Sequence, residues 1–193
     1  MGYYRKLSGS KCYLSPCQPE DAEKWVEWFN DLEVTLPLGD EAYAPCSLER
    51  MRDDVHAIAA HQEHVFSIVD LESDCLIGRC ALFALDQVNR CAMLGIVIGE
   101  KDYWNRGYGR DAVEQLLDYA FNLLNLNSVM LGVFSFNQRG IRSYVKAGFH
   151  EIGRRRETRI IGDQKYDLVL MDILAEEFRS RRESQVLRLL ESG

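Results

Sequence analysis

The sequence predicts one α+β (α/β) domain in which helices flank a mixed, mostly antiparallel sheet of about seven strands. From Val65 to Gly99 the side-chain pattern has a period of two, which is typical of strands; in 91–99 it sets Ala92, Leu94, Ile96 and Ile98 against Cys91, Met93, Gly95 and Val97. Residues 19–29, 48–58 and 111–124 repeat apolar side chains every three or four positions, which is typical of helices. The chain has 193 residues, enough to build one hydrophobic core.

The order of the predicted elements fixes part of the topology. A helix between the strands at 91–99 and 128–136 requires a crossover, so this pair is expected to be parallel within an otherwise antiparallel sheet. We expect one domain over residues 8–175, followed by a charged helix over 176–193. The other predicted elements are a strand at 11–17, a helix that begins at Pro19, a loop at 31–46, a helix capped by Ser47, strands at 65–70 and 75–85, a helix at 111–124, a helix at 138–147 that ends at Gly148, and strands at 149–161 and 165–174 around a Gly162-Asp163 turn.

The segment between the strand at 91–99 and the helix at 111–124 has the features of an anion site. Gly107 and Gly109 allow the backbone to approach a ligand closely. The first N–H groups of the following helix point towards the same place, at the positive end of the helix dipole. With the added charge of nearby arginines, this segment predicts a ligand that carries phosphate groups.

Two common phosphate motifs do not fit this segment. No Gly-Lys pair occurs in the chain, so a P-loop is excluded. A dinucleotide fingerprint needs a third glycine where the chain has Ala112, which makes that match a loose one.

A different family fits better. Residues 104–109, Trp-Asn-Arg-Gly-Tyr-Gly, resemble the pyrophosphate loop of the GNAT superfamily of acetyl-CoA-dependent N-acetyltransferases, although Trp replaces the usual first residue. Residues 137–149 resemble the second signature of that family, with Gly140 in place of the usual Ala or Ser. Residues 156–167 resemble the closing hairpin of RimJ/RimL-like enzymes and of spermidine N-acetyltransferases. The resemblance covers roughly residues 8–175 and implies the GNAT fold, in which a splayed parallel strand pair holds acetyl-CoA.

The resemblance implies acetyl-CoA as co-substrate. The pantetheine arm is expected along the end of the strand at 91–99, where a backbone N–H polarises the thioester carbonyl. The pyrophosphate is expected on the N–H groups that open the next helix, and an asparagine side chain is expected to hydrogen-bond the pantetheine arm. The implied acetyl-CoA-binding residues are Ile96, Val97, Ile98, Gly99, Arg106, Gly107, Tyr108, Gly109, Arg110, Asn137 and Tyr144.

Attack of an amine on a thioester requires loss of an amine proton and protonation of the departing thiolate. By resemblance, Tyr144 protonates the thiolate, although its place on one helix face with Ile141 and Val145 also fits a core tyrosine. Glu100 ends the strand beside the expected thioester and is the candidate base, with an ordered water as the alternative. Ser135 is a rival polar group.

The acceptor is expected to be a primary amine, and a cationic one. Residues 20–74 contain fifteen Asp or Glu against three basic residues, and Glu33, Asp40 and Glu41 lie in the expected acceptor loop. The first interpretation is a RimJ/RimL-like protein N-terminal acetyltransferase. A polyamine (spermidine or spermine), or an aminoglycoside or amino sugar, is the alternative acceptor. A non-catalytic CoA-binding sensor and a nucleotide-binding regulator are alternatives from another class.

Composition and charge limit the partners and the cellular location that we expect. The net charge of −7 argues against nucleic acid as a partner. No apolar run is long enough for a membrane span and no signal peptide is apparent, so we expect a cytoplasmic protein with reduced cysteines. His56, His61 and His64 match no zinc motif, so no metal is expected. The C-terminal helix could pack on the domain or on a second subunit, which leaves a homodimer open.

Overall fold

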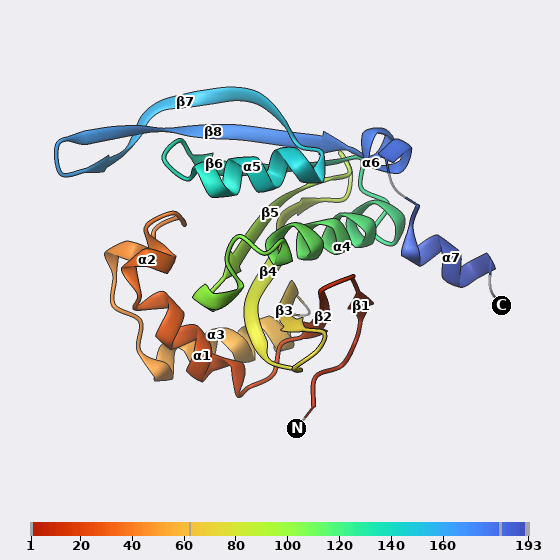
Figure 1. Cartoon of the computed structure of the whole chain (residues 1–193), viewed down its shortest axis with the longest axis horizontal. Coiled ribbons are helices and arrows are strands. Elements are labelled where there is room, and N and C mark those ends of the chain that lie inside the picture. Colours follow the sequence, from red (N-terminus) through yellow and green to blue (C-terminus); the bar gives the residue numbers. More distant parts are fainter. Residues whose placement is uncertain (1, 62, 182, 192–193) are drawn as a thin grey trace. The chain divides into compact units, whose positions relative to one another are not determined.

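The computed structural model describes residues 2–61, 63–181 and 183–191 (Figure 1). The strands are β1 (Leu7–Ser8), β2 (Cys12–Pro16), β3 (His64–Asp70), β4 (Leu76–Asp86), β5 (Cys91–Ile98), β6 (Ser128–Phe134), β7 (His150–Ile161) and β8 (Gln164–Leu174). The helices are α1 (Asp21–Phe29), α2 (Leu32–Thr35), α3 (Leu48–Ala60), α4 (Tyr108–Asn122), α5 (Gln138–Ala147), α6 (Ala175–Arg181) and α7 (Gln185–Glu191), with 3₁₀ turns η1 (Glu41–Tyr43) and η2 (Lys101–Tyr103).

Within the described residues, eight strands form one sheet in the order β1-β2-β3-β4-β5-β6-β8-β7. β5 and β6 are parallel, as the crossover predicted. Antiparallel pairing joins β1 to β2, β2 to β3, β6 to β8 and β8 to β7. The predicted fold class is confirmed, and the two-residue β1 is a strand that the sequence pattern did not indicate.

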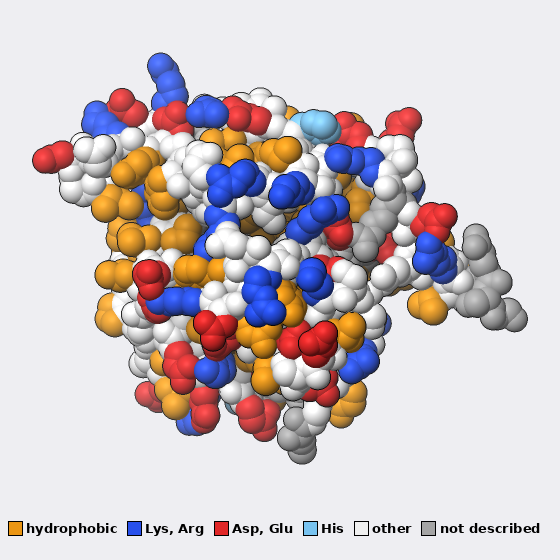
Figure 2. Space-filling view, in the orientation of Figure 1, with side chains coloured by type: hydrophobic (Ala, Val, Ile, Leu, Met, Phe, Trp, Pro, Cys, Tyr) orange, Lys and Arg blue, Asp and Glu red, His pale blue; other side chains and the backbone are white. Residues whose placement is uncertain are grey.

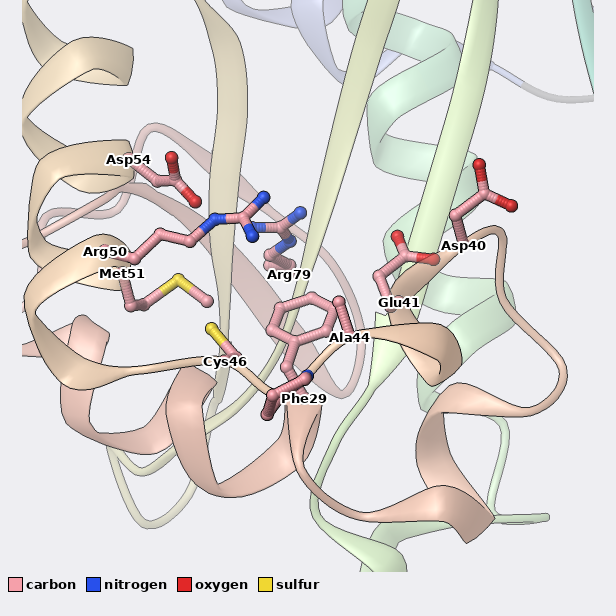
Figure 3. Close-up of a pocket in the computed structure, with 10 residues that line it drawn as sticks. Phe29, Asp40, Glu41, Ala44, Cys46, Arg50, Met51, Asp54 and Arg79 are labelled. Atoms are coloured by element: carbon pink, nitrogen blue, oxygen red, sulfur yellow. The ribbon is translucent and has the colours of Figure 1, made fainter.

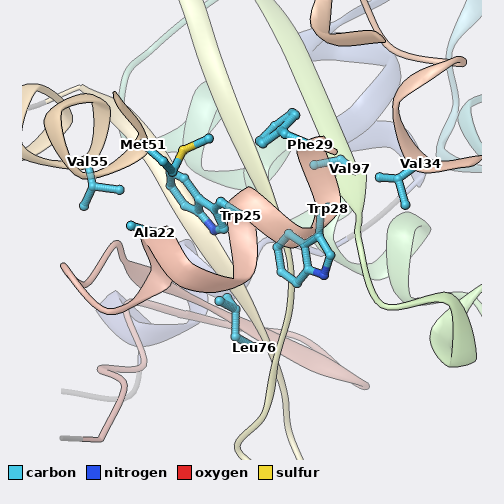
Figure 4. Close-up of a cluster of buried hydrophobic side chains, with 9 residues drawn as sticks. All are labelled: Ala22, Trp25, Trp28, Phe29, Val34, Met51, Val55, Leu76 and Val97. Carbon is cyan, nitrogen blue, oxygen red and sulfur yellow. The ribbon is translucent and has the colours of Figure 1, made fainter. Parts of the chain in front are cut away.

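The chain divides into two compact units. Unit 1 consists of Met1–Ala81 and Ile96–Ala112, and unit 2 consists of Leu82–Gly95 and Val113–Gly193. The core of unit 1 is built by the apolar faces of α1 and α3 and by side chains of β4 and β5 (Figure 4). Apolar residues recur on both helices at the predicted spacing of three or four, which turns them to one side. The cluster contains Ala22, Trp25, Trp28, Phe29, Val34, Met51, Val55, Leu76 and Val97.

In unit 2, β6 and β8 bury every second residue, and the buried residues lie opposite one another. Period-two alternation therefore places one face of both strands in the core. α5 ends at Gly148, whose φ of +110° is the left-handed conformation predicted there. β7 and β8 turn through Gly162-Asp163, as predicted. The buried pairs across β6 and β8 are Val129 with Ile173, Leu131 with Met171, and Val133 with Val169.

The prediction that α1 begins at Pro19 is wrong, because the first helical residue is Asp21. The carbonyl of Gln18 accepts a hydrogen bond from the N–H of Asp21 at 3.0 Å, and the Asp21 carboxylate accepts one from the N–H of Gln18 at 2.8 Å. These two bonds hold residues 18–21 in a turn that precedes the helix.

The prediction of a plain loop at residues 31–46 is wrong, because this segment contains α2 and η1. Pro37 and Gly39 indicate irregular backbone, but Asp31 is an N-cap whose side chain accepts a hydrogen bond from the N–H of Glu33. The prediction of a single C-terminal helix is also wrong, because the described residues form two separate helices there, α6 and α7. The N–H groups of Gln185 and Val186 donate to Asp118, which fixes the start of α7 against α4.

Other sequence expectations concern the surface and the cysteines. All six cysteines are free thiols. Among the described residues, no helix has both the length and the apolar character needed to cross a membrane. Acidic and basic side chains are interspersed on the face seen in Figure 2, so the net negative charge does not make that face uniformly acidic.

Candidate functional site

The predicted anion site of unit 1 is the start of α4. The helix begins at Tyr108 rather than at residue 111, and the N–H of Asp111 donates to the carbonyl of Gly107 at 3.0 Å. Gly107 has φ +89°, a conformation that glycine adopts readily and side-chain-bearing residues do not. Gly109 and Arg110 therefore lie in the first helical turn, where N–H groups point out of the helix end.

Three side chains around this turn, those of Tyr108, Arg106 and Lys11, make different contacts. Tyr108 is buried and its hydroxyl donates to Asp70 at 2.9 Å, so at the helix start only its backbone is available for contacts. The Arg106 guanidinium lies 5.7 Å from the ring of Tyr103 and 5.9 Å from that of Tyr108. Lys11 is a basic residue at this turn that sequence reasoning missed. Its Nζ lies 5.6 Å from the Tyr108 ring, and its Cε lies 3.4 Å from the place a Cβ on Gly107 would take.

Lys11 is held there by Asp111. The buried Asp111 carboxylate accepts hydrogen bonds from the backbone N–H groups of Ser10, Lys11 and Cys12 and from the Ser10 hydroxyl. Burial alone would raise the pKa of Asp111, but these hydrogen bonds hold the pKa below its ordinary value. No local sequence signal could reveal Lys11, because this long-range clasp brings it to the helix start.

The end of β5 is the expected pantetheine segment, and part of its backbone is already engaged. The parallel register joins Cys91–Met93 to Ser128–Met130, while β5 continues to Ile98 and β6 to Phe134. The N–H groups of Gly99 and Glu100 both donate to the carbonyl of Ile77 in β4, at 2.9 and 3.2 Å. A backbone donor for the thioester carbonyl is therefore expected at residues 96–98 rather than at Gly99.

The Glu100 carboxylate is held by two donors at the same oxygen. Trp28 donates its indole N–H to Oε1 at 3.1 Å, and Lys24 lies 3.1 Å from Oε1 in an ion pair. The pKa of Lys24 is raised by its hydrogen bond to Glu27, which has the larger effect, and by its hydrogen bond to Glu100. Trp28 is a buried core residue, and its indole hydrogen bond fixes the position of the Glu100 carboxylate.

In unit 2, Asn137 caps α5. Its Oδ1 accepts a hydrogen bond from the N–H of Gly140 at 2.9 Å, and a Cβ at Gly140 would lie 2.7 Å from the Asn137 Nδ2. The glycine that departs from the family pattern thus leaves room for the cap. Ser135 joins β8, since its N–H donates to the carbonyl of Asp167 at 2.9 Å and its hydroxyl accepts from the N–H of Asp167 at 3.2 Å.

Tyr144 lies on α5 and is partly buried. Its ring packs edge to face against Phe149, with the centroids 5.9 Å apart. Burial raises the pKa of Tyr144 to about 12. The phenol therefore keeps its proton at neutral pH, which is the state that a general acid needs.

Unit 1 also contains a cavity of about 530 Å³ (Figure 3). Two of the three predicted acceptor residues, Asp40 and Glu41, line this cavity. Glu33 is not among the lining residues; it forms an ion pair with Lys101, which also pairs with Asp31 at 2.7 Å. The lining residues are Phe29, Asp40, Glu41, Ala44, Pro45, Cys46, Arg50, Met51, Asp54 and Arg79.

Within 2–61, 63–181 and 183–191, no group of three or more His, Cys, Asp or Glu side chains is placed to hold a metal ion. Burial lowers the pKa of His64, which lies in β3.

Comparison with known proteins identifies the family of the chain. Residues 11–150 match the model of the acetyltransferase (GNAT) domain family, and the chain belongs to that family. An uncharacterized N-acetyltransferase, p20 of Bacillus licheniformis, is 29% identical over 169 residues, 86% of this chain and 93% of the relative. A spermidine N(1)-acetyltransferase of Vibrio cholerae is 30% identical over 121 residues, 63% of this chain and 69% of the relative.

Solved structures agree on the fold. Spermidine N-acetyltransferase from Vibrio cholerae, solved in complex with CoA and spermine, superposes with a TM-score of 0.79 at 24% identity, over 88% of this chain and 99% of that one. A GNAT-family acetyltransferase from Bacillus anthracis gives a TM-score of 0.77 at 19% identity, over 89% and 99%. The predicted family and enzyme class are confirmed: the chain is an acetyl-CoA-dependent N-acetyltransferase.

Proposed function

We propose that the chain transfers the acetyl group of acetyl-CoA to the N-terminal amine of a protein or peptide, as a RimJ/RimL-like cytoplasmic enzyme. The observation that carries this choice is the mixed charge of the cavity in unit 1. Its lining contains the carboxylates of Asp40, Glu41 and Asp54 together with the guanidinium groups of Arg50 and Arg79. Besides its amine, the first residues of a peptide offer carbonyl oxygens and acidic side chains that arginines can bind, whereas a polyamine offers only cationic groups.

The residues at the start of α4 suit the phosphates of acetyl-CoA. Gly107 and Gly109 keep the backbone accessible, and Lys11 and Arg106 provide positive charge beside it. These features support a role for the turn in pyrophosphate binding. Bound acetyl-CoA supplies an activated thioester, and the backbone of residues 96–98 is proposed to polarise its carbonyl.

The chain's own side chains would then handle two protons. The amine nitrogen bonds to the thioester carbon, and the carbon–sulfur bond breaks. Tyr144 is proposed to give its phenolic proton to the departing thiolate of CoA, because its raised pKa keeps it protonated. The amine proton goes to Glu100 or to an ordered water. The contacts of Glu100 Oε1 with Lys24 and Trp28 favour the water, with Glu100 as its positioning residue.

A polyamine acceptor is the second candidate. The similarity to a spermidine N(1)-acetyltransferase favours it, as do the many carboxylates of unit 1. A Bacillus subtilis relative, 32% identical over 107 residues, is provisionally named a ribosomal N-acetyltransferase, which favours the first candidate. Because Glu33 pairs with Lys101, Asp40 and Glu41 are the predicted acceptor carboxylates that line the cavity and could bind a cationic group.

Release of free CoA thiol from acetyl-CoA, measured against a panel of acceptors, tests the proposal. The panel contains spermidine, an aminoglycoside, and peptides that begin with Ser, Ala or Met. Turnover with the peptides is expected. Turnover with spermidine and none with any peptide would contradict the choice of acceptor while leaving the enzyme class intact.

A homodimer through the C-terminal helices is proposed as well. Leu187 and Leu190 of α7 are exposed, at 43% and 78%. Light scattering on the full chain and on a chain that ends after α6 tests this, because a dimer that uses α7 becomes a monomer on truncation. The same oligomeric state before and after the truncation, or a monomeric full chain, would contradict it.

A further inference from the structure

We propose that Arg50 and Arg79 bind a carboxylate of the acceptor, so that the preferred substrate is a peptide whose amino terminus is followed closely by an acidic side chain. This inference rests on the proposed function, since it specifies the acceptor of the same reaction. It concerns only the cavity of unit 1.

Two aromatic rings, rather than an ion pair with any described residue, fix the direction of the Arg79 side chain in β4. Its guanidinium carbon lies 4.7 Å from the ring centroids of both Trp25 and Phe29, so two aromatic faces fix its direction. Burial lowers the pKa of Arg79, and Glu41 and Asp54 act on it from beyond ion-pair distance. Among the described residues, no carboxylate forms an ion pair with this guanidinium. A desolvated cation of this kind is stabilised when an anion reaches it.

Arg50 directs a second guanidinium towards the same cavity. It lies in the first turn of α3, one helical turn before Asp54, so the two side chains share a face. Figure 3 shows the side chains of Arg50 and Arg79 both directed into the cavity. Two guanidinium groups in one cavity repel each other, and the carboxylates of Asp54 and Glu41 in the lining offset part of that repulsion; a ligand carboxylate between the two groups would offset the rest. The planar fork of each group matches the two oxygens of a carboxylate.

The other part of the lining calls for a hydrogen-bond donor on the same ligand. The Oε2 atom of Glu41 is buried and has no hydrogen-bond partner. Asp40 precedes it in the lining. A peptide amide or ammonium group satisfies Glu41, and an acidic side chain of the same peptide satisfies the arginines. A polyamine could satisfy Glu41 but would bring further cations towards Arg50 and Arg79.

The volume is adequate for this occupant. Ligand pockets generally measure some hundreds of Å³, and about 530 Å³ holds a short peptide segment with one acidic side chain. Peptides of matched length, Ser-Glu-Glu against Ser-Gln-Gln at the amino terminus, differ in charge and hardly in shape. We expect kcat/KM to favour the acidic peptide by about tenfold or more, the size of one charge-assisted hydrogen bond.

Variants locate the effect. Arg50→Gln should lower this preference several-fold, mainly through a higher KM for the acidic peptide. Arg52→Gln is the matched control, because Arg52 is exposed on the same helix, pairs with Glu23 and does not line the cavity. It should keep the preference. Arg79→Gln should also lower the preference. If that variant does not fold, Arg50→Gln alone tests whether the arginines of the cavity cause the preference for the acidic peptide.

Binding measured by calorimetry separates this inference from the proposed function. N-acetylated forms of the two peptides cannot react, and the wild-type chain should bind the acidic one more tightly. If peptides are acetylated without preference for the acidic one, the inference is overturned and the function stands. If no peptide is acetylated, the function fails, and equal affinity for the two blocked peptides overturns the inference as well.

Discussion

The indole ring of Trp28 lies directly against Gly99. A Cβ built on Gly99 would lie 2.0 Å from Cδ2 of the indole, far inside any real contact. The same indole donates its N–H to Glu100. Glycine is thus required at the end of β5 for packing rather than for an unusual φ angle, and the tryptophan sets both the strand end and the carboxylate beside it.

Gly99→Ala should destabilise the chain by about 2 kcal/mol, because overpacking of a filled core typically costs about 1–3 kcal/mol. Chemical denaturation would measure this loss. Gly153→Ala is the matched control, since a Cβ there meets nothing within 4 Å. Equal stability of the two variants would contradict the packing that we describe.

Gly109→Val should weaken acetyl-CoA binding at least tenfold with little loss of stability. A Cβ at Gly109 makes only an ordinary contact with Ile98, at 3.7 Å, so the added methyl groups should mainly obstruct the pyrophosphate. Gly107→Val should lose both affinity and stability, because φ is +89° there. Calorimetry and thermal melts together separate the two effects. Wild-type affinity in the Gly109 variant would rule out this turn as the phosphate site.

Tyr144→Phe should lower kcat about a hundredfold and leave the affinity for acetyl-CoA nearly unchanged, since general acid catalysis is generally worth about 10²–10⁴ in rate. Because the pKa of Tyr144 is raised to about 12, its ionisation should not limit kcat at any pH from 6 to about 10. Tyr43→Phe, at an exposed tyrosine of η1, is the control. An equal loss of rate and affinity would make Tyr144 a structural residue.

Asp111→Asn should destabilise the chain by about 3 kcal/mol or more, because buried hydrogen bonds to a charged group are worth about 1.5–3 kcal/mol each. The pKa of Asp111 is lowered in the folded state by the hydrogen bonds from residues 10–12. Its contribution is therefore complete above the unfolded pKa of about 4 and is lost as pH falls through the folded pKa. Denaturation between pH 3 and 7 should show an acid-dependent loss in the wild type that is smaller in the variant. The same pH dependence in both would show that Asp111 is not the group that titrates.

The sequence predicted the fold class and most elements, because their signals are local. Gly148 ends α5 where a left-handed residue was expected, and Gly162-Asp163 turns the hairpin between β7 and β8. The local pattern predicted helix boundaries wrongly where a capping side chain or a hydrogen-bonded turn determines them. Asp31 begins a short helix inside an expected loop, and Gln18 holds a turn that delays α1 to Asp21.

The sequence by itself determined that the chain has a glycine-containing helix start suited to phosphates, because residue type and spacing within a few positions decide such a turn. Only the tertiary structure decided which distant side chains join it. Asp111 brings Lys11 to the turn, Trp28 holds Glu100, and Trp25 and Phe29 aim Arg79 into the cavity. These pairings depend on contacts between residues far apart in the chain, whose free energy is gained only when the core closes, so no local pattern encodes them.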